Sequence, residues 1–339
     1  MVKIGVIGLG MMGSTHLDAY GKLADAQIVA VADWDDDVLC GKNKAQGNVE
    51  GQAQSSFDLN NPSLKKYADA MALIQDDNVQ LVDICLPTPD HVKYAVAALQ
   101  AGKHVILEKP LARSNQDTQT LIDAAAKAKG ISMCALCMRF WPQWKWLKEQ
   151  VVSQTYGKVL SATFKRMASH PGKGFYLNGD DCGGAALDLH IHDTDFVQYL
   201  FGMPKSVTSV GYSKETTAVD HLVTQYAYDD IPLVMAEGGW SMTDGFGFQM
   251  HYTINFENAT AVFDISKTDQ LMLHEVGKES RAITCESGMG YDHELAYILN
   301  CIKLGKQPEH SGFADAARSV KIVLAEVQSV KTGQAVVLD

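Results

Sequence analysis

Short apolar runs alternate with amphipathic stretches along the first part of the chain. The apolar runs, which predict buried strands, lie at residues 2–7, 28–32, 81–86, 105–107 and 131–137. Helical spacing of apolar positions, with capping residues and glycine stops near the ends, marks residues 11–23, 68–74, 90–100 and 114–128. Strands that alternate with helices in this way predict an α/β fold with a right-handed, doubly wound parallel sheet.

The second part of the chain has a different pattern. Strand-like segments follow one another at residues 159–167, 206–212, 222–228, 233–241, 249–256, 260–265 and 271–274. Several show the period-two alternation of a sheet with one covered face, so we expect a large, mostly antiparallel open sheet. Two helices, at about 291–304 and 313–331, complete an α+β domain. We therefore predict two domains, at residues 1–138 and 139–339.

The composition is that of an ordinary globular protein. The 339 residues are 46% hydrophobic and 20% charged, and 29 basic against 40 acidic residues give a net charge of -11. This balance argues against nucleic acid or an anionic membrane as a partner. No apolar run approaches the ~20 residues of a membrane span. The first residues lack a signal-peptide pattern, and the seven scattered cysteines suit a reducing compartment, so we expect a cytoplasmic protein.

A glycine-rich turn separates the first strand from the first helix. Gly8, Gly10 and Gly13 have the spacing of the dinucleotide-binding fingerprint, in the strand–turn–helix context that it requires. Gly8 permits a tight turn, Gly10 lets the backbone approach a pyrophosphate, and Gly13 allows close helix–strand packing. The turn, with Met11 and Met12, is predicted to hold the pyrophosphate at a helix N-terminus, as in a Rossmann domain.

The second strand leads into Asp33, twenty positions after Gly13. An acid at this place can accept both ribose hydroxyls of the adenosine half of a dinucleotide. Trp34 is expected to lie beside the same half. Residues 35–37 are three further aspartates, which we interpret as an acidic helix start. This acidic cluster, with no arginine nearby, would repel a 2′-phosphate. We predict NAD as the cofactor, with NADP as the less favoured alternative.

The segment from Val105 to Pro110 places a lysine at the end of an apolar strand. Pro110 cannot donate to a sheet and disfavours a helical conformation at Lys109, so the strand stops there. Lys109, with Glu108 beside it, is therefore expected at the carboxyl end of a strand, where open α/β sheets hold their ligands. A solvated surface charge is the alternative for a lysine considered alone.

A loop follows the strand at 81–86 and leaves the same edge of the sheet. Leu86, Pro87, Thr88 and His91 belong to this loop. Because ligands of such sheets bind outside the carboxyl ends of the strands, we expect the loop to lie along the nicotinamide half of the cofactor.

Two other segments carry less information. Cys134 and Cys137 have the spacing of redox or zinc pairs, but a strand would turn them to opposite sides, and no second pair or histidine completes a site. We interpret them as core cysteines and expect no metal. Residues 41–64, rich in Gly, Asn, Gln and Ser, predict an irregular excursion whose role the sequence does not indicate.

The stretch around His190 can be interpreted in two ways. In a strand, Asp-x-His-x-His would place His190 and His192 on one side, as in metal-dependent amidohydrolases. In a helix the two histidines diverge, while Asp188, His192, Asp195 and Tyr199 fall within an arc of roughly 60°. An amidohydrolase would need a barrel that begins here, after a first half of nucleotide-binding type. We therefore favour a helix of about four to five turns that ends in a glycine.

The helical interpretation suggests a mechanism. Histidine has an unperturbed pKa of about 6.5, so His192 is a candidate base near neutral pH. Asp188, one turn away, can hold the tautomer of His192 and stabilise the imidazolium. Lys109 would stabilise the alkoxide charge that develops as hydride leaves the substrate carbon for the nicotinamide. A histidine that is merely satisfied by Asp188 is the structural alternative.

The motifs recur in one order along essentially the whole chain: Gly8-x-Gly10-x-x-Gly13, Asp33, Pro87-Thr88-Pro89-Asp90-His91, Ala101-Gly102-Lys103-His104-Val105, Glu108-Lys109-Pro110, Arg139-Phe140-x-Pro142, Gly183-Gly184-Ala185-Ala186-Leu187-Asp188-x-x-x-His192, Tyr291-x-x-Glu294 and Thr332-Gly333. In this order they resemble the glucose–fructose oxidoreductase / inositol dehydrogenase / MocA (Gfo/Idh/MocA) family of NAD(P)-dependent oxidoreductases. Two features depart from the family pattern. His190 stands where glycine is common, and residues 41–64 look longer than usual.

The resemblance implies an NAD-dependent dehydrogenase that oxidises a secondary hydroxyl of a sugar or an inositol-like polyol. Lys109 and His192 would flank the reacting hydroxyl, with Asp188 beside them. Arg139 matches a position that often contacts polar substrate, and His170, in a loop, could line the pocket. The open sheet would support a homodimer or homotetramer. Two alternatives remain: a relative that retains NAD and uses transient oxidation for glycoside cleavage or epimerisation, and a non-catalytic NAD-binding sensor.

Overall fold

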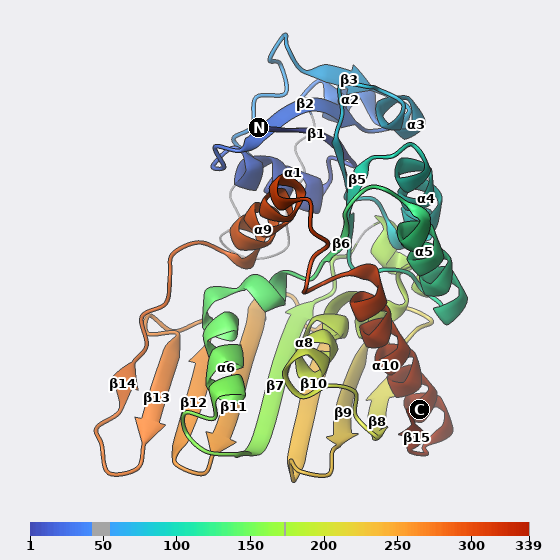
Figure 1. Ribbon diagram of the computed structural model, residues 1–339. Helices are drawn as coiled ribbons and strands as arrows, with labels where there is room; N and C mark the ends of the chain where they lie inside the picture. The colour runs from blue at the N-terminus through green and yellow to red at the C-terminus, as the bar shows by residue number, and fades with distance from the viewer. Residues whose placement is uncertain (43–54, 173, 339) are drawn as a thin grey trace. The chain divides into compact units, whose positions relative to one another are not determined.

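The computed structural model describes residues 1–42, 55–172 and 174–338 (Figure 1). Its contacts divide the chain into two compact units. Unit 1 comprises Met1–Phe140 and Gly288–Ala317, and unit 2 comprises Trp141–Ser287 and the chain from Arg318 onward. Of the excursion predicted at 41–64, residues 43–54 lie outside the described residues.

Unit 1 is built on a six-stranded parallel sheet with the order β3-β2-β1-β4-β5-β6. Its strands are β1 (Val2–Ile7), β2 (Ala26–Ala32), β3 (Lys65–Tyr67), β4 (Leu81–Ile84), β5 (His104–Glu108) and β6 (Ser132–Ala135). The strand order reverses direction between β1 and β4, which is the switch point where doubly wound sheets bind their ligands. The predicted parallel, doubly wound sheet is confirmed.

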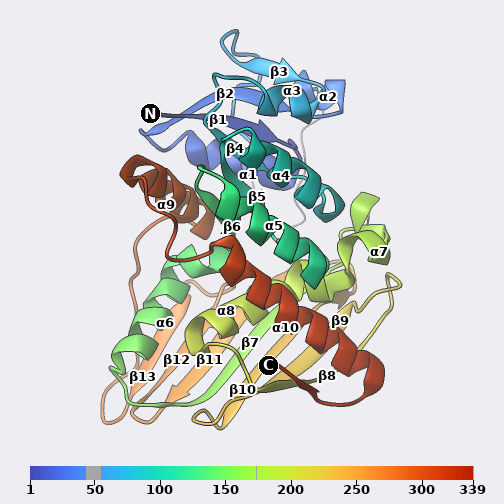
Figure 2. The ribbon, with the colours of Figure 1, turned by 45° about the vertical axis from the view of Figure 1, so that its right-hand side comes forward.

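Helices cover both faces of this sheet (Figure 2). α1 and α9 pack together on one face, and α3, α4 and α5 pack in a row on the other. The helices of unit 1 are α1 (Met11–Tyr20), α2 (Asp36–Leu39), α3 (Ala70–Ile74), α4 (His91–Gln100), α5 (Asn115–Lys127) and α9 (Gly290–Leu304). The capping pair predicted for α5 is present, because Ser114 Oγ accepts the N–H of Asp117 at 3.0 Å and donates to its carboxylate at 2.8 Å.

The helix α9 comes late in the chain but belongs to unit 1. Leu295 and Ile298 are fully buried and share a core cluster with Leu17 and Tyr20 of α1. The boundary predicted at residues 138 and 139 therefore does not describe residues 288–317, which return to the first unit. The apolar stripe of α9 is buried there, against α1.

Unit 2 contains a nine-stranded sheet with the order β14-β13-β12-β11-β7-β10-β9-β8-β15. Its strands are β7 (Val159–Ser169), β8 (Ser206–Tyr212), β9 (His221–Ala227), β10 (Leu233–Met242), β11 (Phe248–Phe256), β12 (Ala259–Asp264), β13 (Leu271–Glu275), β14 (Arg281–Ala282) and β15 (Val336–Val337). β7 and β10 pair in parallel, and the other pairs are antiparallel. The predicted large, mostly antiparallel sheet is confirmed.

Three helices lie along one face of this second sheet, α6, α8 and α10 (Figures 1 and 2). The helices with residues in unit 2 are α6 (Pro142–Ser153), α7 (Gly179–Cys182), α8 (Ile191–Phe201) and α10 (Phe313–Thr332). Trp144 of α6 is fully buried, and its ring meets Phe196 of α8 edge-on at 4.7 Å and Tyr252 of β11 at 5.2 Å between centroids. Among the described residues, no helix is long and apolar enough to cross a membrane.

β3 and β6 differ from the predicted pattern. The sequence indicated no strand at β3, because Lys65–Tyr67 forms a short, polar edge strand with little apolar burial. The strand predicted at 131–137 ends at Ala135, and the chain then forms a 3₁₀ turn, Cys137–Phe140. Cys134 and Cys137 are buried, as expected of core cysteines, and all seven cysteines are free.

Candidate active site

The glycine turn of unit 1 has the geometry that its spacing predicts. Gly8 has a φ of +85°, and a Cβ at this position would lie 2.6 Å from the carbonyl oxygen of Cys85. A side chain at Gly13 would overlap the carbonyl oxygen of Gly8. The first glycine therefore permits the left-handed turn, and the last permits α1 to pack against β1.

Gly10 marks the accessible part of this turn. It is exposed, and a Cβ built on it would meet no atom within 4 Å. α1 begins directly after it, at Met11. The N–H groups of Met11, Met12 and Gly13 have no acceptor inside the helix, which is the arrangement that binds a phosphate group. These residues fit the pyrophosphate of a dinucleotide.

Asp33, directly after β2, is tied to the glycine turn. One carboxylate oxygen accepts the N–H of Leu9 at 2.7 Å, and the other accepts that of Asp35 at 3.0 Å. A carboxylate oxygen can accept more than one hydrogen bond, so both oxygens retain capacity for a ribose hydroxyl. Trp34 is 84% exposed. The arrangement fits the adenosine half of the predicted cofactor.

Lys109 follows the last residue of β5 and is half-buried. The peptide bond that joins it to Pro110 is cis. Glu108, by contrast, is buried, and one of its carboxylate oxygens accepts the N–H of Lys109 at 3.0 Å. Its other oxygen lies 3.3 Å from Nε2 of His16. The side chain of Glu108 therefore lies in the interior of unit 1, and its predicted contact with the cofactor stays a prediction.

His91 ties the loop after β4 to the end of β5. It is fully buried, with Nδ1 2.9 Å from the carbonyl oxygen of Pro110 and Nε2 2.9 Å from that of Leu86. Burial lowers the pKa of His91, although these two carbonyl groups oppose the effect. His91 thus holds the two loops together, and its predicted cofactor contact stays a prediction. Thr88 is also buried, whereas Leu86 is half-buried and Pro87 is exposed.

In unit 2 the helix predicted after Gly184 is present, and it begins with a π-helical turn. Ala186–His190 forms this turn, and α8 continues directly from it. Single π turns occur frequently at functional sites. His192, the predicted base, and Asp188, its predicted orienting partner, are both half-buried.

The rest of the predicted polar face is used for packing. Asp195 is buried and accepts a hydrogen bond from Ser319 of α10 at 2.6 Å. The ring of Tyr199 lies beneath the ammonium group of Lys148, 4.5 Å from nitrogen to centroid. α10 and α6 therefore cover the C-terminal half of this face.

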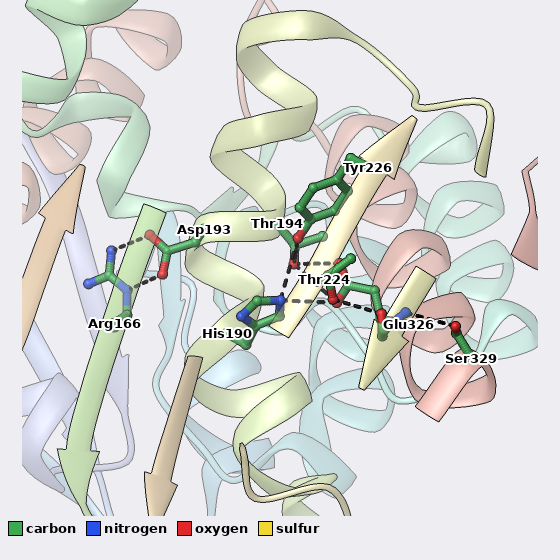
Figure 3. A network of polar contacts seen from close by, with 9 residues as sticks. Arg166, His190, Asp193, Thr194, Thr224, Tyr226, Glu326 and Ser329 are labelled. Atoms are coloured by element: carbon green, nitrogen blue, oxygen red, sulfur yellow. Dashed lines mark hydrogen bonds and ion pairs between the residues drawn. The ribbon is translucent and has the colours of Figure 1, made fainter. Parts of the chain in front are cut away.

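His190 is fully buried on the interior side of this segment (Figure 3). Its Nε2 lies 3.4 Å from a carboxylate oxygen of Glu326 and 3.4 Å from the hydroxyl of Tyr226. Thr194 donates to the same carboxylate at 3.0 Å. The amidohydrolase interpretation requires His190 and His192 on the same side of the chain. It does not fit this network, because His190 is buried in the interior whereas His192 is partly accessible.

A buried ion pair lies beside this network and was missed by the sequence analysis. Arg166 of β7 donates to both carboxylate oxygens of Asp193, at 2.9 and 3.1 Å (Figure 3). Asp193 is the neighbour of His192, so the pair fixes this part of α8 to the sheet. The one signal in the sequence was a charged residue at an inward position of an alternating strand, where it requires a partner.

The two other predicted substrate contacts are occupied by protein groups. Arg139 is 3% exposed and pairs with Asp315 inside unit 1. His170 contacts the carbonyl oxygen of Tyr176 with Nε2 at 3.1 Å and accepts the N–H of Gly172 with Nδ1 at 2.9 Å. Both ring nitrogens of His170 are thus used within its own loop, and the substrate contacts of Arg139 and His170 stay predictions.

A doubly wound parallel sheet, with an accessible glycine turn after its first strand and an acid after its second, defines a dinucleotide-binding α/β protein. The chain belongs to the Gfo/Idh/MocA family. The family profile described as "Oxidoreductase family, NAD-binding Rossmann fold" matches residues 2–135, and that of the "GFO/IDH/MocA C-terminal domain" matches residues 144–262. The resemblance inferred from the motifs is confirmed.

Curated relatives carry the names of sugar and polyol dehydrogenases. Myo-inositol 2-dehydrogenase of Thermotoga maritima is 34% identical over 203 residues, 59% of this chain and 55% of that protein. Levoglucosan dehydrogenase of Pseudarthrobacter phenanthrenivorans is 29% identical over 217 residues, 62% of this chain and 53% of that protein. The chain thus matches about half the length of these relatives.

Solved structures share the fold across the whole chain. A levoglucosan dehydrogenase in complex with NADH and levoglucosan superimposes with a TM-score of 0.85 at 20% identity, covering 99% of both chains. At this identity the likeness establishes the architecture of the two sheets.

Proposed function

We propose that this protein is an NAD-dependent dehydrogenase that oxidises a secondary hydroxyl of a sugar or a cyclic polyol of the inositol type. The observation that carries the proposal is an accessible glycine turn with Lys109 at the carboxyl end of a strand of the same sheet. Ligands of such sheets bind at these strand ends. The names of the matched relatives, an inositol and a levoglucosan dehydrogenase, support the substrate class.

The catalytic groups in this proposal are Lys109, His192 and Asp188. Bound nicotinamide supplies the acceptor for the two electrons and the hydrogen that leave the substrate carbon. The ammonium group of Lys109 stabilises the negative charge that develops on the substrate oxygen. The imidazole of His192 accepts the hydroxyl proton, and Asp188 stabilises the resulting imidazolium.

NAD is the proposed cofactor because the adenosine end of the site is acidic. Asp33 would lie against a 2′-phosphate, and Asp35 caps the helix that follows. The expected result is a higher kcat/KM with NAD than with NADP. A lower KM for NADP than for NAD would contradict the assignment.

We also propose a cytoplasmic homodimer or homotetramer. Seven free cysteines fit a reducing compartment. In the described part of unit 2, the sheet face opposite α6, α8 and α10 carries no helix (Figures 1 and 2). Light scattering of the purified protein measures the oligomeric state, and a monomer would contradict this part of the proposal.

The test of the function is an NADH-absorbance screen of inositols, aldoses, anhydrosugars and glycosides. With the best substrate, we expect Lys109→Ala and His192→Ala each to lower kcat by about 10²-fold or more. Lys127→Ala, at an exposed position of α5, is the matched control and should leave kcat unchanged. Wild-type kcat in either active-site variant would contradict the assigned roles.

A further inference from the structure

A group of charged side chains lies buried behind the glycine turn. His16 of α1 and Asp83 of β4 are 0% exposed, and Glu108 of β5 is 6% exposed. Nδ1 of His16 lies 2.9 Å from a carboxylate oxygen of Asp83, and Nε2 lies 3.3 Å from one of Glu108. We call these three residues the His16 bridge. None of them has a role in the chemistry described above.

The His16 bridge continues to the backbone of Lys109. The second carboxylate oxygen of Glu108 accepts the N–H of Lys109 at 3.0 Å. His16 itself lies in the helix that begins at the glycine turn. The contacts therefore run without interruption from the helix of the predicted cofactor site to the peptide that orients Lys109.

We propose that His16 is a positioning residue, whose imidazolium holds Glu108 as a carboxylate and thereby fixes the peptide group of Lys109. This inference rests on the proposed function only in assigning catalysis to Lys109. The positioning itself concerns contacts within unit 1 and can be measured without substrate.

The positions of the two carboxylates favour two protons on the ring. Nδ1 is hydrogen-bonded to Asp83, and Nε2 lies within ion-pair distance of Glu108 without a hydrogen bond to any described residue. Each ring nitrogen faces a carboxylate oxygen, and a neutral imidazole would direct a lone pair at one of them. Burial alone would lower the pKa of His16, but the neighbouring Asp83 carboxylate raises it well above the usual range. The ring of Tyr291, at 6.4 Å between centroids, also faces His16 from α9.

The remaining titratable groups around His16 are neutral. Burial raises the pKa of the Tyr20 hydroxyl and of the Cys85 thiol. Glu294 of α9 is fully buried, and neither carboxylate oxygen has a hydrogen-bond partner among the described residues. Burial raises the pKa of Glu294 well above the usual range, and Glu108 and Asp83 add to this although His16 opposes it. In the proposed His16 bridge one imidazolium balances two carboxylates, which leaves a single negative charge.

A metal ion is the competing interpretation of part of this group. One ligand atom each from His16, Asp83 and Cys85 lies within 4.8 Å of the others. The thiol, however, donates to Asp83 at 3.3 Å, and both ring nitrogens already face carboxylates. The arrangement therefore fits protons between these groups better than a metal ion. Elemental analysis decides the point, because a stoichiometric transition metal in the purified protein would overturn the proposal.

The decisive variants separate the effect of charge in the His16 bridge from the effect of side-chain packing. His16→Gln leaves two buried carboxylates without a cation, so one must take up a proton and Glu108 becomes a poorer acceptor for Lys109. We expect kcat to fall by about 10- to 100-fold while the KM for NAD changes by less than about 3-fold. The double variant His16→Gln/Asp83→Asn restores the single negative charge, and we expect its kcat to return to within about 5-fold of wild type.

A purely structural role predicts a different pattern. The double variant would then be at least as impaired as His16→Gln, and that result would overturn the proposal. His104→Gln is the matched control, because this half-buried histidine lies at the opposite end of β5 and accepts the N–H of Ile131 at 3.0 Å. It should leave kcat unchanged.

A spectroscopic test requires no activity. In protein labelled with [15N]histidine, we expect an imidazolium signal at pH 8 that disappears in His16→Gln. In protein labelled with [15N]lysine, the amide signal of Lys109, assigned by its loss in Lys109→Arg, should move in His16→Gln and return in the double variant. An unmoved Lys109 amide overturns the His16 bridge even in an active enzyme. A moved amide in a protein without dehydrogenase activity rejects the proposed function and leaves the bridge intact.

Discussion

Two glycines of the same turn are constrained in different ways. A methyl group at Gly13 would overlap the carbonyl oxygen of Gly8, and that backbone atom cannot move without opening the turn. A methyl group at Gly10 would meet no protein atom within 4 Å. The first constraint comes from the fold itself, and the second exists only when a pyrophosphate approaches the backbone.

We therefore expect opposite outcomes for two similar substitutions. Gly10→Ala should unfold at the wild-type temperature but bind NAD at least about 10-fold more weakly, because the new methyl group occupies the path of the pyrophosphate. Gly13→Ala should lower the unfolding temperature as well, since a steric clash with backbone costs about 1–3 kcal/mol. Thermal unfolding and calorimetric titration with NAD measure the two effects. Wild-type NAD affinity in Gly10→Ala would contradict the assigned pyrophosphate site.

Glu294 gives a prediction on pH dependence. Burial raises its pKa in the folded protein well above the usual range of a glutamate, so folding favours its protonated form. Such a group stabilises the fold below the pKa of the unfolded chain, and this contribution is lost as the pH rises. Glu294→Gln removes this pH dependence of the free energy of unfolding. We therefore expect the stability of the variant relative to wild type to increase between pH 5 and pH 8.

Urea unfolding at the two pH values measures this gain. The exposed Glu279→Gln serves as the control and should change stability equally at both. A gain for Glu294→Gln that is larger at pH 5 than at pH 8 would show that the buried carboxyl is ionised in the native protein.

Single residues also show how far the sequence determines the site. Gly8, Gly13 and Asp33 were predicted correctly in geometry, because each acts on backbone close to it in sequence or one strand away. The pairing of Arg139 with Asp315 was not predicted, because Asp315 comes 176 positions later. The sequence around Arg139 shows that a charged residue is present, but it does not show which distant residue pairs with that charge.

At the scale of elements, the π-helical turn that precedes α8 depends on a neighbouring loop. The N–H of Ala186 donates to the carbonyl oxygen of Val219 at 3.1 Å. The loop is itself organised by Asp220, whose carboxylate accepts the N–H groups of Lys214 at 2.9 Å and Thr216 at 2.7 Å. It also accepts the indole N–H of Trp240 at 2.9 Å. The segment that carries Asp188 and His192 is thus stabilised by a loop outside the helix.

Asp220→Asn is expected to loosen this support. The amide group of asparagine would place a donor against backbone donors, which costs about 1–3 kcal/mol for a buried position. Burial raises the pKa of Asp220, but the hydrogen bonds from Lys214 and Thr216 outweigh this effect and lower the pKa below its ordinary value of 3.8. The stabilisation is therefore complete above that pH and is lost as the pH falls below it.

Urea unfolding of wild type and Asp220→Asn at pH 7 and near pH 3 checks the prediction. The difference in free energy of unfolding should be larger at pH 7. Equal differences at both would mean that the charge of Asp220 does not stabilise the loop.

The elements that the sequence predicted are those whose own residues form a recognisable apolar pattern. β1, β2, β4 and β5 are short apolar runs buried on both faces, and such runs are recognisable without knowledge of the fold. β3 has polar residues at a sheet edge, so it has no such run. The return of α9 to unit 1 could not be predicted, because its apolar stripe does not specify which surface it covers.

At the scale of the whole molecule, the proposed chemistry draws on both units. Lys109 belongs to unit 1 and His192 to unit 2. The fold class and the family were accessible from the sequence because their motifs extend over both. The substrate was not, since the residues that select one polyol over another have no fixed spacing.

If Lys109 and His192 act on one substrate hydroxyl, their effects on kcat cannot be independent. Groups that work as a unit in one transition state give strongly non-additive losses. We expect Lys109→Ala/His192→Ala to have a kcat within about 3-fold of the more impaired single variant. Lys109→Ala combined with His274→Asn, a substitution at an exposed histidine of β13, is the matched control and should equal Lys109→Ala alone. Losses that multiply in the first pair would place the two residues in separate steps, and the proposed pairing of ammonium and imidazole would then be rejected.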